Sequence, residues 1–121
     1  PDVGIALDTT LCCDTPGVPD EMQINKLGNG VSIKFMDSSH IADRALLESF
    51  EDVARKKRIK FQRSILPAGG TDSGTIQRSA DGVRVLTLAC PVRYIHTITE
   101  MAAISDIEGY RDLIAAWIAQ A

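Results

Sequence analysis

Apolar residues recur along this chain with two different periods, and they divide it into strands and helices. Short apolar runs, typical of buried strands, cover residues 3–8, 31–37, 59–66 and 83–90. Apolar positions at helical spacing predict a helix over 43–58, which has acidic residues early and basic residues at its end, the order that the helix dipole favours. Since strands and helices alternate, we expect an α/β fold with a mostly parallel sheet flanked by helices.

The segments between these runs carry turn and cap signals. Residues 9–30 are polar and rich in Gly and Pro, so they predict a long loop. A short helix is expected between Thr71, a candidate N-cap, and Gly82. The pattern Ser105-Asp106-Ile107-Glu108 resembles a capping box that opens a last helix. The predicted apolar stripe of that helix consists of Ile107, Tyr110, Ile114, Trp117 and Ile118.

Composition and charge narrow the functional classes. The length of 121 residues suits one domain, 45% of the residues are hydrophobic, and the net charge is −3 without a basic stripe, which argues against nucleic acid as a partner. Neither a membrane-length apolar run nor a signal-peptide pattern is visible, so we expect a cytoplasmic protein. Three cysteines without metal-binding spacing predict reduced thiols.

Three features fall after or at the end of predicted strands, where open α/β sheets bind their ligands. Asp8 ends the first strand, and a carboxylate there needs a cation or hydrogen-bond donors; a loop hydrogen bond is the plain alternative. The turn Gly69-Gly70-Thr71-Asp72 lets the backbone approach a ligand and opens a helix. It lacks the P-loop lysine and the dinucleotide-binding glycines, so a tight turn explains it equally well.

The third feature is His96, in the segment RYIHTITE after the fourth strand. A neutral imidazole is a common ligand of transition metals, although a lone loop histidine is more often structural. Glu100 is positioned to orient His96 by accepting its second ring N–H. His40, before the long helix, is interpreted as a surface or helix-approach residue.

These features occur together in an order that resembles family 42 of the metallopeptidases, the TET-type aminopeptidases. The family includes proteins called glutamyl aminopeptidase, deblocking aminopeptidase or endoglucanase. The similarity spans nearly the whole chain. It rests on the motifs PDVGIALDTT, DTPGVP, KLGNG, the strand that ends in MD, GGTDSG and PVRYIH with the following TxxE.

The resemblance implies hydrolytic release of N-terminal residues from peptides by a water that two metal ions, zinc or cobalt, activate. Asp8 would be a carboxylate ligand of one ion and His96 an imidazole ligand of the other. Gly70, Thr71, Asp72 and Glu100 would bind substrate or support the ligands. Family members form homo-oligomers, from dimers to dodecamers, so we expect the full-length protein to assemble likewise.

The family's other metal ligands and its general-base glutamate have no counterpart here, and its dimerisation insert is also missing. We therefore expect residues 1–121 to be the C-terminal part of a catalytic domain that is inactive alone. Two alternatives stay open. One is another amidohydrolase or deacylase with two metal ions. The other is a catalytically incomplete fragment that acts as a structural subunit.

Overall fold

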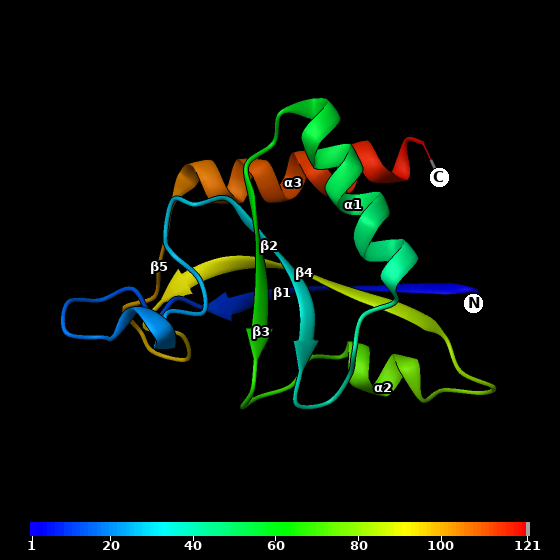
Figure 1. The fold of residues 1–121 in the computed structure, drawn as a ribbon, viewed down its shortest axis with the longest axis horizontal. Coiled ribbons are helices and arrows are strands. Elements are labelled where there is room, and N and C mark those ends of the chain that lie inside the picture. The colour runs from blue at the N-terminus through cyan, green and yellow to red at the C-terminus, as the bar shows by residue number, and fades with distance from the viewer. Residues whose placement is uncertain (121) are drawn as a thin grey trace.

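The computed structural model of the chain describes residues 1–120 (Figure 1). The strands are β1 (Val3–Leu11), β2 (Val31–Asp37), β3 (Phe61–Leu66), β4 (Arg84–Arg93) and β5 (Met101–Ala102). The helices are α1 (Arg44–Lys57), α2 (Ser73–Gln77) and α3 (Ile104–Ile118), and a 3-10 turn covers Asp20–Met22. The expected α/β class is confirmed.

The strands form one sheet in the order β1-β4-β2-β3, and β5 pairs with the end of β4. The pairs β1–β4 and β2–β3 are parallel, as predicted. They meet through an antiparallel pairing of β2 with β4 that places Lys34 opposite Thr87. The sheet is therefore mixed, and the two parallel pairs run in opposite senses within it.

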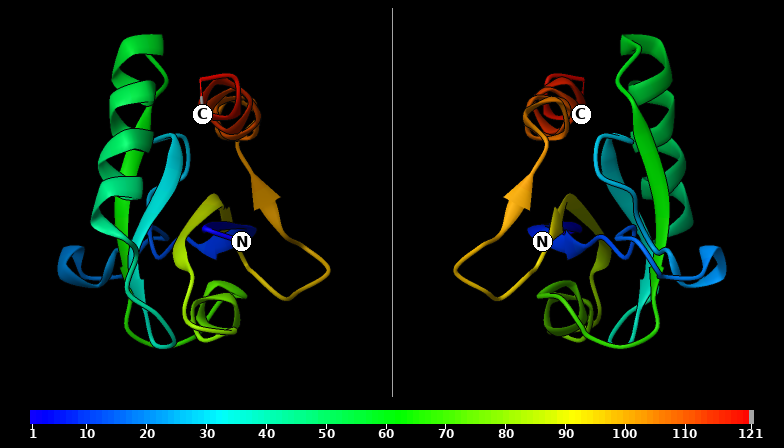
Figure 2. Two further views of the ribbon diagram at one scale, coloured as in Figure 1. Left: turned by 90° about the vertical axis from the view of Figure 1, so that its right-hand side faces the viewer. Right: turned by 90° about the vertical axis from the view of Figure 1, so that its left-hand side faces the viewer.

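The hydrophobic core lies between the sheet and helices α1 and α3. Phe50 of α1 is fully buried and stacks on Trp117 of α3, with ring centroids 4.5 Å apart. Val31 and Ile33 of β2 pack into the same cluster. The short helix α2 lies on the other side of β1 and β4 (Figure 2), so helices flank both sides of the sheet, as expected.

Helix α1 follows its predicted bounds within a residue. Asp43 is the N-cap and accepts a hydrogen bond from the backbone N–H of Leu46, which satisfies one of the free donors of the first turn. The chain leaves the helix at Arg58 in a left-handed conformation with φ 57°. The basic residues 55–58 at the end of this helix are exposed. This agrees with the prediction that they mark the C-terminus of the helix.

The last helix differs from its prediction. It begins at Ile104, and its N-cap residue, Ala103, makes no side-chain cap bond, so the prediction of a capping box is wrong. Asp106 is instead buried and accepts hydrogen bonds from the backbone N–H groups of Gly28 and Gly30. The buried stripe contains Leu113, which the prediction missed, whereas Ile107 and Ile118 are exposed.

The long loop after β1 is held in place by carboxylates. Asp106 fixes its end, and Asp14 near its start pairs with Arg93 at 2.8 Å and accepts from the backbone N–H of Leu27. Hydrogen bonding to Arg93 lowers the pKa of Asp14, against the effect of burial. The loop is thus tied to both β4 and α3.

Within the described residues, every helix is too short or too polar to cross a bilayer.

Candidate functional site

A pocket of about 340 Å³ brings together residues from four separate segments of the chain. Asp8 comes from β1, Lys34 from β2, Gly69–Thr71 from the loop before α2, and His96 from the loop after β4. Four of the six predicted site residues, Asp8, Gly70, Thr71 and His96, therefore line one cavity. Asp72 and Glu100 are not among its lining residues.

The mixed sheet explains how these segments meet. Strands β1 and β4 cross β2 and β3 at a steep angle, so the loop after β3 and the loop after β4 lie on the same side of the molecule (Figure 1). A mostly parallel sheet was expected to bring the loops together at the edge where its strands have their carboxyl ends. The crossing of the strands brings these loops to one pocket although the two parallel pairs run in opposite senses.

Asp8 does not end its strand, as the sequence suggested. It lies within β1, which continues to Leu11, and is paired in register with Ala89 of β4. Its side chain is exposed, and its Oδ1 accepts a hydrogen bond of 2.7 Å from the backbone N–H of Thr9. The other carboxylate oxygen has no protein partner within the part of the chain described, so it is available to a ligand.

His96 sits in a strained turn. Its φ is 64°, and that of Tyr94 is 57°, so both lie in the left-handed region that residues with side chains seldom adopt. Strained backbone that neighbouring groups hold in place is common at functional sites. The imidazole is exposed and lines the pocket.

Glu100 holds this turn, but not in the way we predicted. Its Oε1 accepts a hydrogen bond of 2.6 Å from the backbone N–H of His96, not from the ring. Thr97 adds a second bond, from its hydroxyl to the carbonyl of Tyr94 at 2.6 Å. Glu100 therefore fixes the position of His96 through the backbone.

The Gly69–Thr71 turn is fastened to the end of β2. The Thr71 hydroxyl donates to Oδ2 of Asp37 at 2.9 Å and lies 2.8 Å from the hydroxyl of Thr87. Ser38 donates to the carbonyl of Gly69 at 2.7 Å. The residue at the N-cap of α2 is Asp72, whose side chain makes no cap bond, so the prediction of Thr71 as the cap is wrong.

Asp37 and His40 form a buried pair beneath this turn. Oδ1 of Asp37 lies 3.0 Å from Nδ1 of His40, and both side chains are fully buried. Burial alone would raise the pKa of Asp37, but hydrogen bonds from Ser39, Thr71 and His40 outweigh it and hold the pKa well below its usual range. His40 therefore lies on the approach to α1, one of the two expected places, but it is buried and not at the surface.

Lys34 is a pocket residue that the sequence analysis missed. Its side chain is fully buried, and its ammonium donates to the hydroxyl of Thr10 at 3.1 Å. Burial lowers the pKa of Lys34, and the charges of Asp37 and Asp8 partly oppose that effect. A lysine inside the apolar strand VSIKFMD was the available signal, because a buried charge needs a partner or a ligand.

The donors in this pocket suit part of a metal site. One carboxylate and one imidazole are a mixed oxygen and nitrogen set of the kind that zinc and similar ions accept. Within residues 1–120 no group of three or more His, Cys, Asp or Glu side chains is placed to hold a metal ion. Asp8 and His96 therefore fit as two donors of a metal site that needs further ligands.

The thiols are poor candidates as additional ligands. All three cysteines are free. Burial, with the nearby charge of Asp14, raises the pKa of Cys12 to about 12, and burial also raises the pKa of Cys90. Metals bind thiolates, so protonated thiols of this kind agree with the interpretation of the cysteines as structural.

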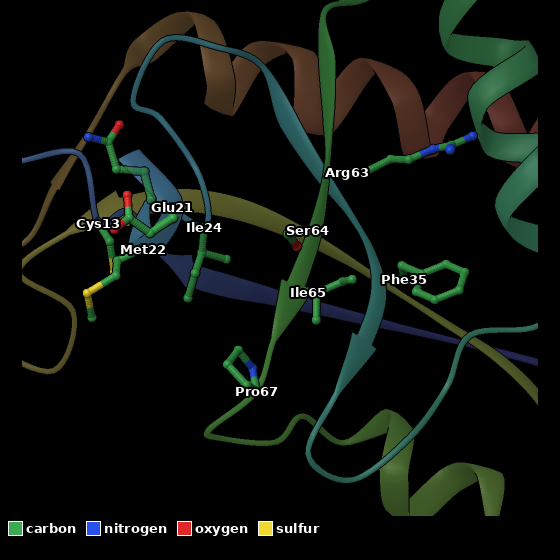
Figure 3. A pocket seen from close by; sticks show the side chains of 10 residues that line it. Cys13, Glu21, Met22, Ile24, Phe35, Arg63, Ser64, Ile65 and Pro67 are labelled. Carbon is green, nitrogen blue, oxygen red and sulfur yellow. The ribbon is translucent and has the colours of Figure 1, made fainter. Parts of the chain in front are cut away.

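A larger hollow of about 810 Å³ lies elsewhere, between the long loop and β3 (Figure 3). Its wall is mostly apolar, with Met22, Ile24, Phe35, Ile65 and Pro67 around it. None of the predicted site residues lines it. We therefore assign the chemistry to the smaller pocket, where ionisable groups converge.

Comparisons with known proteins identify the family. Residues 1–113 match the model of the M42 glutamyl aminopeptidase family, and the chain belongs to that family. Among solved structures, the aminopeptidase APDkam598 of the archaeon Desulfurococcus kamchatkensis is 35% identical with a TM-score of 0.96, over 100% of this chain and 35% of that one. The Pyrococcus horikoshii TET1 peptidase is 32% identical with a TM-score of 0.79, over 96% and 32%.

Two curated relatives differ in the activity that their names give. A glutamyl aminopeptidase of Lactococcus lactis is 30% identical over 88% of this chain and 28% of its own length. A lysyl aminopeptidase of Pyrococcus furiosus is 31% identical over 89% of this chain and 30% of its own length. The chain thus spans about a third of the length of the relatives it matches.

Proposed function

We propose that these residues are the C-terminal part of the catalytic domain of a metal-dependent aminopeptidase that releases N-terminal residues from peptides. The observation that carries the proposal is the single pocket shared by Asp8, His96 and the Gly69–Thr71 turn. These groups are far apart in the sequence, and a family of aminopeptidases has the same fold.

Within the site, each segment of this chain has a separate task. Asp8 and His96 would hold two divalent metal ions, zinc or cobalt, together with ligands from upstream residues. When bound, such ions supply an activated water and stabilise negative charge on the reacting carbonyl. Asp8 offers an uncommitted carboxylate oxygen, and Glu100 fixes His96 through its backbone N–H.

The Gly69–Thr71 turn would form a wall for the substrate. Its conformation is set from below, because Asp37 accepts the hydroxyl hydrogen of Thr71 and Ser38 binds the carbonyl of Gly69. A wall fixed in this way positions a peptide without having to become ordered when the peptide binds. Asp72 lies outside the pocket lining, at the N-cap of α2. Any support that it gives the site is therefore through the position of α2, and not as a ligand of metal or substrate.

The assembly and location of the protein follow from the same proposal. The P. horikoshii relative can assemble into a tetrahedron or a large octahedral shell. We propose that the full-length protein is likewise a homo-oligomer and that it acts on peptides in the cytoplasm.

The proposal is tested by incubating the purified full-length protein with short peptides and analysing the products by mass spectrometry. We expect free N-terminal amino acids, and loss of that activity after chelation with recovery on adding zinc or cobalt. Release of acetate from acetylated peptides, or of C-terminal residues, would show a different amidohydrolase. No hydrolysis with any divalent metal would favour a structural subunit.

A further inference from the structure

Lys34 carries a buried charge that its own neighbours do not neutralise. The side chain is fully buried in β2, and its ammonium donates a hydrogen bond to the neutral hydroxyl of Thr10 at 3.1 Å. None of the salt bridges among residues 1–120 includes Lys34, so no carboxylate of that part of the chain lies within 4.0 Å of the ammonium. A lysine ammonium has three donors, and Thr10 takes one of them.

The pairing of the strands places this ammonium on the same face of the sheet as Asp8. Lys34 lies opposite Thr87 of β4, which in turn lies opposite Ala6 of β1. Because side chains two residues apart in a strand point to the same face, Asp8 and Thr10 project from that face as well. The rise between them is roughly 7 Å, so an ammonium bound to Thr10 lies beside Asp8. The charge of Asp8 is accordingly among those that raise the pKa of Lys34 against the effect of burial.

This is the part of the pocket to which the reacting carbonyl of a substrate would come. Lys34 and Asp8 line the same 340 Å³ pocket, together with His96. In the proposed function Asp8 holds one of the metal ions, and such ions act on the carbonyl of the peptide bond. The carbonyl oxygen therefore arrives on the face that carries the ammonium. Every peptide brings that oxygen, whatever its N-terminal side chain.

Hydrolysis makes the carbonyl oxygen negative for part of the reaction. As the oxygen of a water molecule bonds to the carbonyl carbon, the π electron pair of the C=O bond moves onto the carbonyl oxygen. The pair returns when the C–N bond breaks and the amine leaves with a proton that the water has given up. A fixed cation beside this oxygen binds the transition state more tightly than the uncharged peptide, and this difference raises kcat.

We propose that Lys34 is a catalytic residue, whose ammonium donates a hydrogen bond to the carbonyl oxygen of the peptide bond that is cut. The inference rests on the proposed function, since it adds a donor to the same reaction. The ammonium keeps its three protons throughout and stabilises the negative oxygen through its charge and one N–H. Thr10 holds the ammonium in place before the substrate binds, so it does not have to reorient in the transition state.

The first test measures steady-state kinetics of the full-length enzyme, loaded with zinc or, in a second preparation, with cobalt. The substrates are peptides that begin with Glu, Gln, Leu or Lys and are otherwise identical. K34M keeps the length of the side chain without its charge or its donors. We expect kcat to fall by roughly 100-fold to 1,000-fold on all four peptides, the usual effect of removing one donor to a developing oxyanion. KM should stay within about threefold of the wild type, because the uncharged ground state gains little from the ammonium.

The second test measures binding and needs no turnover. The ligand is a phosphinic peptide, in which a tetrahedral phosphorus with a charged oxygen replaces the carbonyl carbon of the bond that is cut. Calorimetric titrations should show that K34M binds it at least roughly 10-fold more weakly than the wild type, as expected for an analogue of the transition state. Elemental analysis should find equal metal content in the two proteins, so that the loss cannot come from the ligands of the metal.

Controls separate catalysis from folding. K34R keeps a charge and donors and should recover part of the kcat that K34M loses. K56M, at an exposed lysine of α1, should behave as the wild type. K34M should melt no lower than the wild type, because an apolar side chain replaces a buried charge.

Four outcomes overturn the inference. A kcat of K34M within about threefold of the wild type, with unchanged binding of the phosphinic peptide, removes the contact while the aminopeptidase function stands. A loss confined to peptides with one kind of N-terminal residue places the ammonium at the substrate side chain instead. A loss of bound metal that parallels the loss of kcat shows that Lys34 acts through Asp8. Absence of any hydrolysis by the wild type with either metal refutes the proposed function, and the inference fails with it.

Discussion

Glu100 accepts a hydrogen bond of 2.6 Å from the backbone N–H of His96, four residues before it, and so holds that residue at a φ of 64°. A left-handed conformation of a residue with a side chain costs about 1 to 3 kcal/mol, so it persists only where neighbouring groups enforce it. The relationship makes Glu100 a positioning residue, which acts on the pocket through the backbone of His96.

Replacing Glu100 should therefore affect activity through the position of His96. We expect E100A to lower kcat/KM for peptide hydrolysis by roughly 10-fold or more, because a small displacement of a ligand is costly in an active site. E100Q keeps an oxygen acceptor for the same N–H and should lose much less. Similar losses in the two variants would show that the charge of Glu100, and not its hydrogen bond, is what matters.

Asp37 should make the stability of the protein depend on acid pH. Its pKa in the folded protein lies below the ordinary value of 3.8. Its contribution to the free energy of unfolding is therefore complete above about pH 5, and it is lost as the pH falls below 3.8 toward the lowered pKa of the folded state. We expect D37N to lower the free energy of unfolding at pH 7 by about 2 kcal/mol, the scale of hydrogen bonds to a charged group. Urea titrations at pH 7 and pH 3 measure the difference, which should shrink at pH 3.

The matched control for this prediction is D72N, at an exposed aspartate next to the same turn whose side chain makes no cap bond. That variant should be within about 0.5 kcal/mol of the wild type at both pH values. A deficit of D37N that is as large at pH 3 as at pH 7 would contradict the account of its ionised, hydrogen-bonded carboxylate.

Gly30 should tolerate no side chain. Its φ is 91°, and a Cβ there would overlap the backbone carbonyl of Lys60 where the loop enters β2. Gly17 has the same φ of 91° but has open space around it, which makes it a matched control. We expect G30A to cost at least about 3 kcal/mol, as steric overlap with backbone adds to the conformational strain, and G17A only about 1 kcal/mol. Thermal melts of the two variants check this order, and equal melting temperatures would contradict it.

Local sequence patterns were sufficient to predict the main strands and α1, and to place Asp8 and His96 close to the ends of two strands. The apolar runs around Asp8 and before His96 gave the strands, and the helical spacing over 43–58 gave α1, because each is a property of neighbouring residues. Strand ends were less certain: β1 and β4 each continue for three further residues. Most of the added residues pair with the other strand, and Arg93 pairs with β5.

Tertiary contacts decided what the patterns could not. Ser105 and Glu108 have capping-box spacing, yet the buried Asp106 between them binds the distant loop at Gly28 and Gly30. Thr71 has the sequence context of an N-cap, but its hydroxyl donates a hydrogen bond to Asp37 at the end of β2. Lys34 enters the pocket because β2 runs antiparallel to β4, a pairing that no local pattern contains.

The central claim is that Asp8 and His96 each hold a metal ion in the complete enzyme. The most direct measurement is the metal content per chain of the full-length protein, by elemental analysis after dialysis, for the wild type and the variants D8A and H96A, with D72N as the control. We expect about two zinc or cobalt ions in the wild type and in D72N, and a loss of about one from each of the other two variants. Unchanged metal content in both D8A and H96A, with peptide hydrolysis intact, would contradict the account.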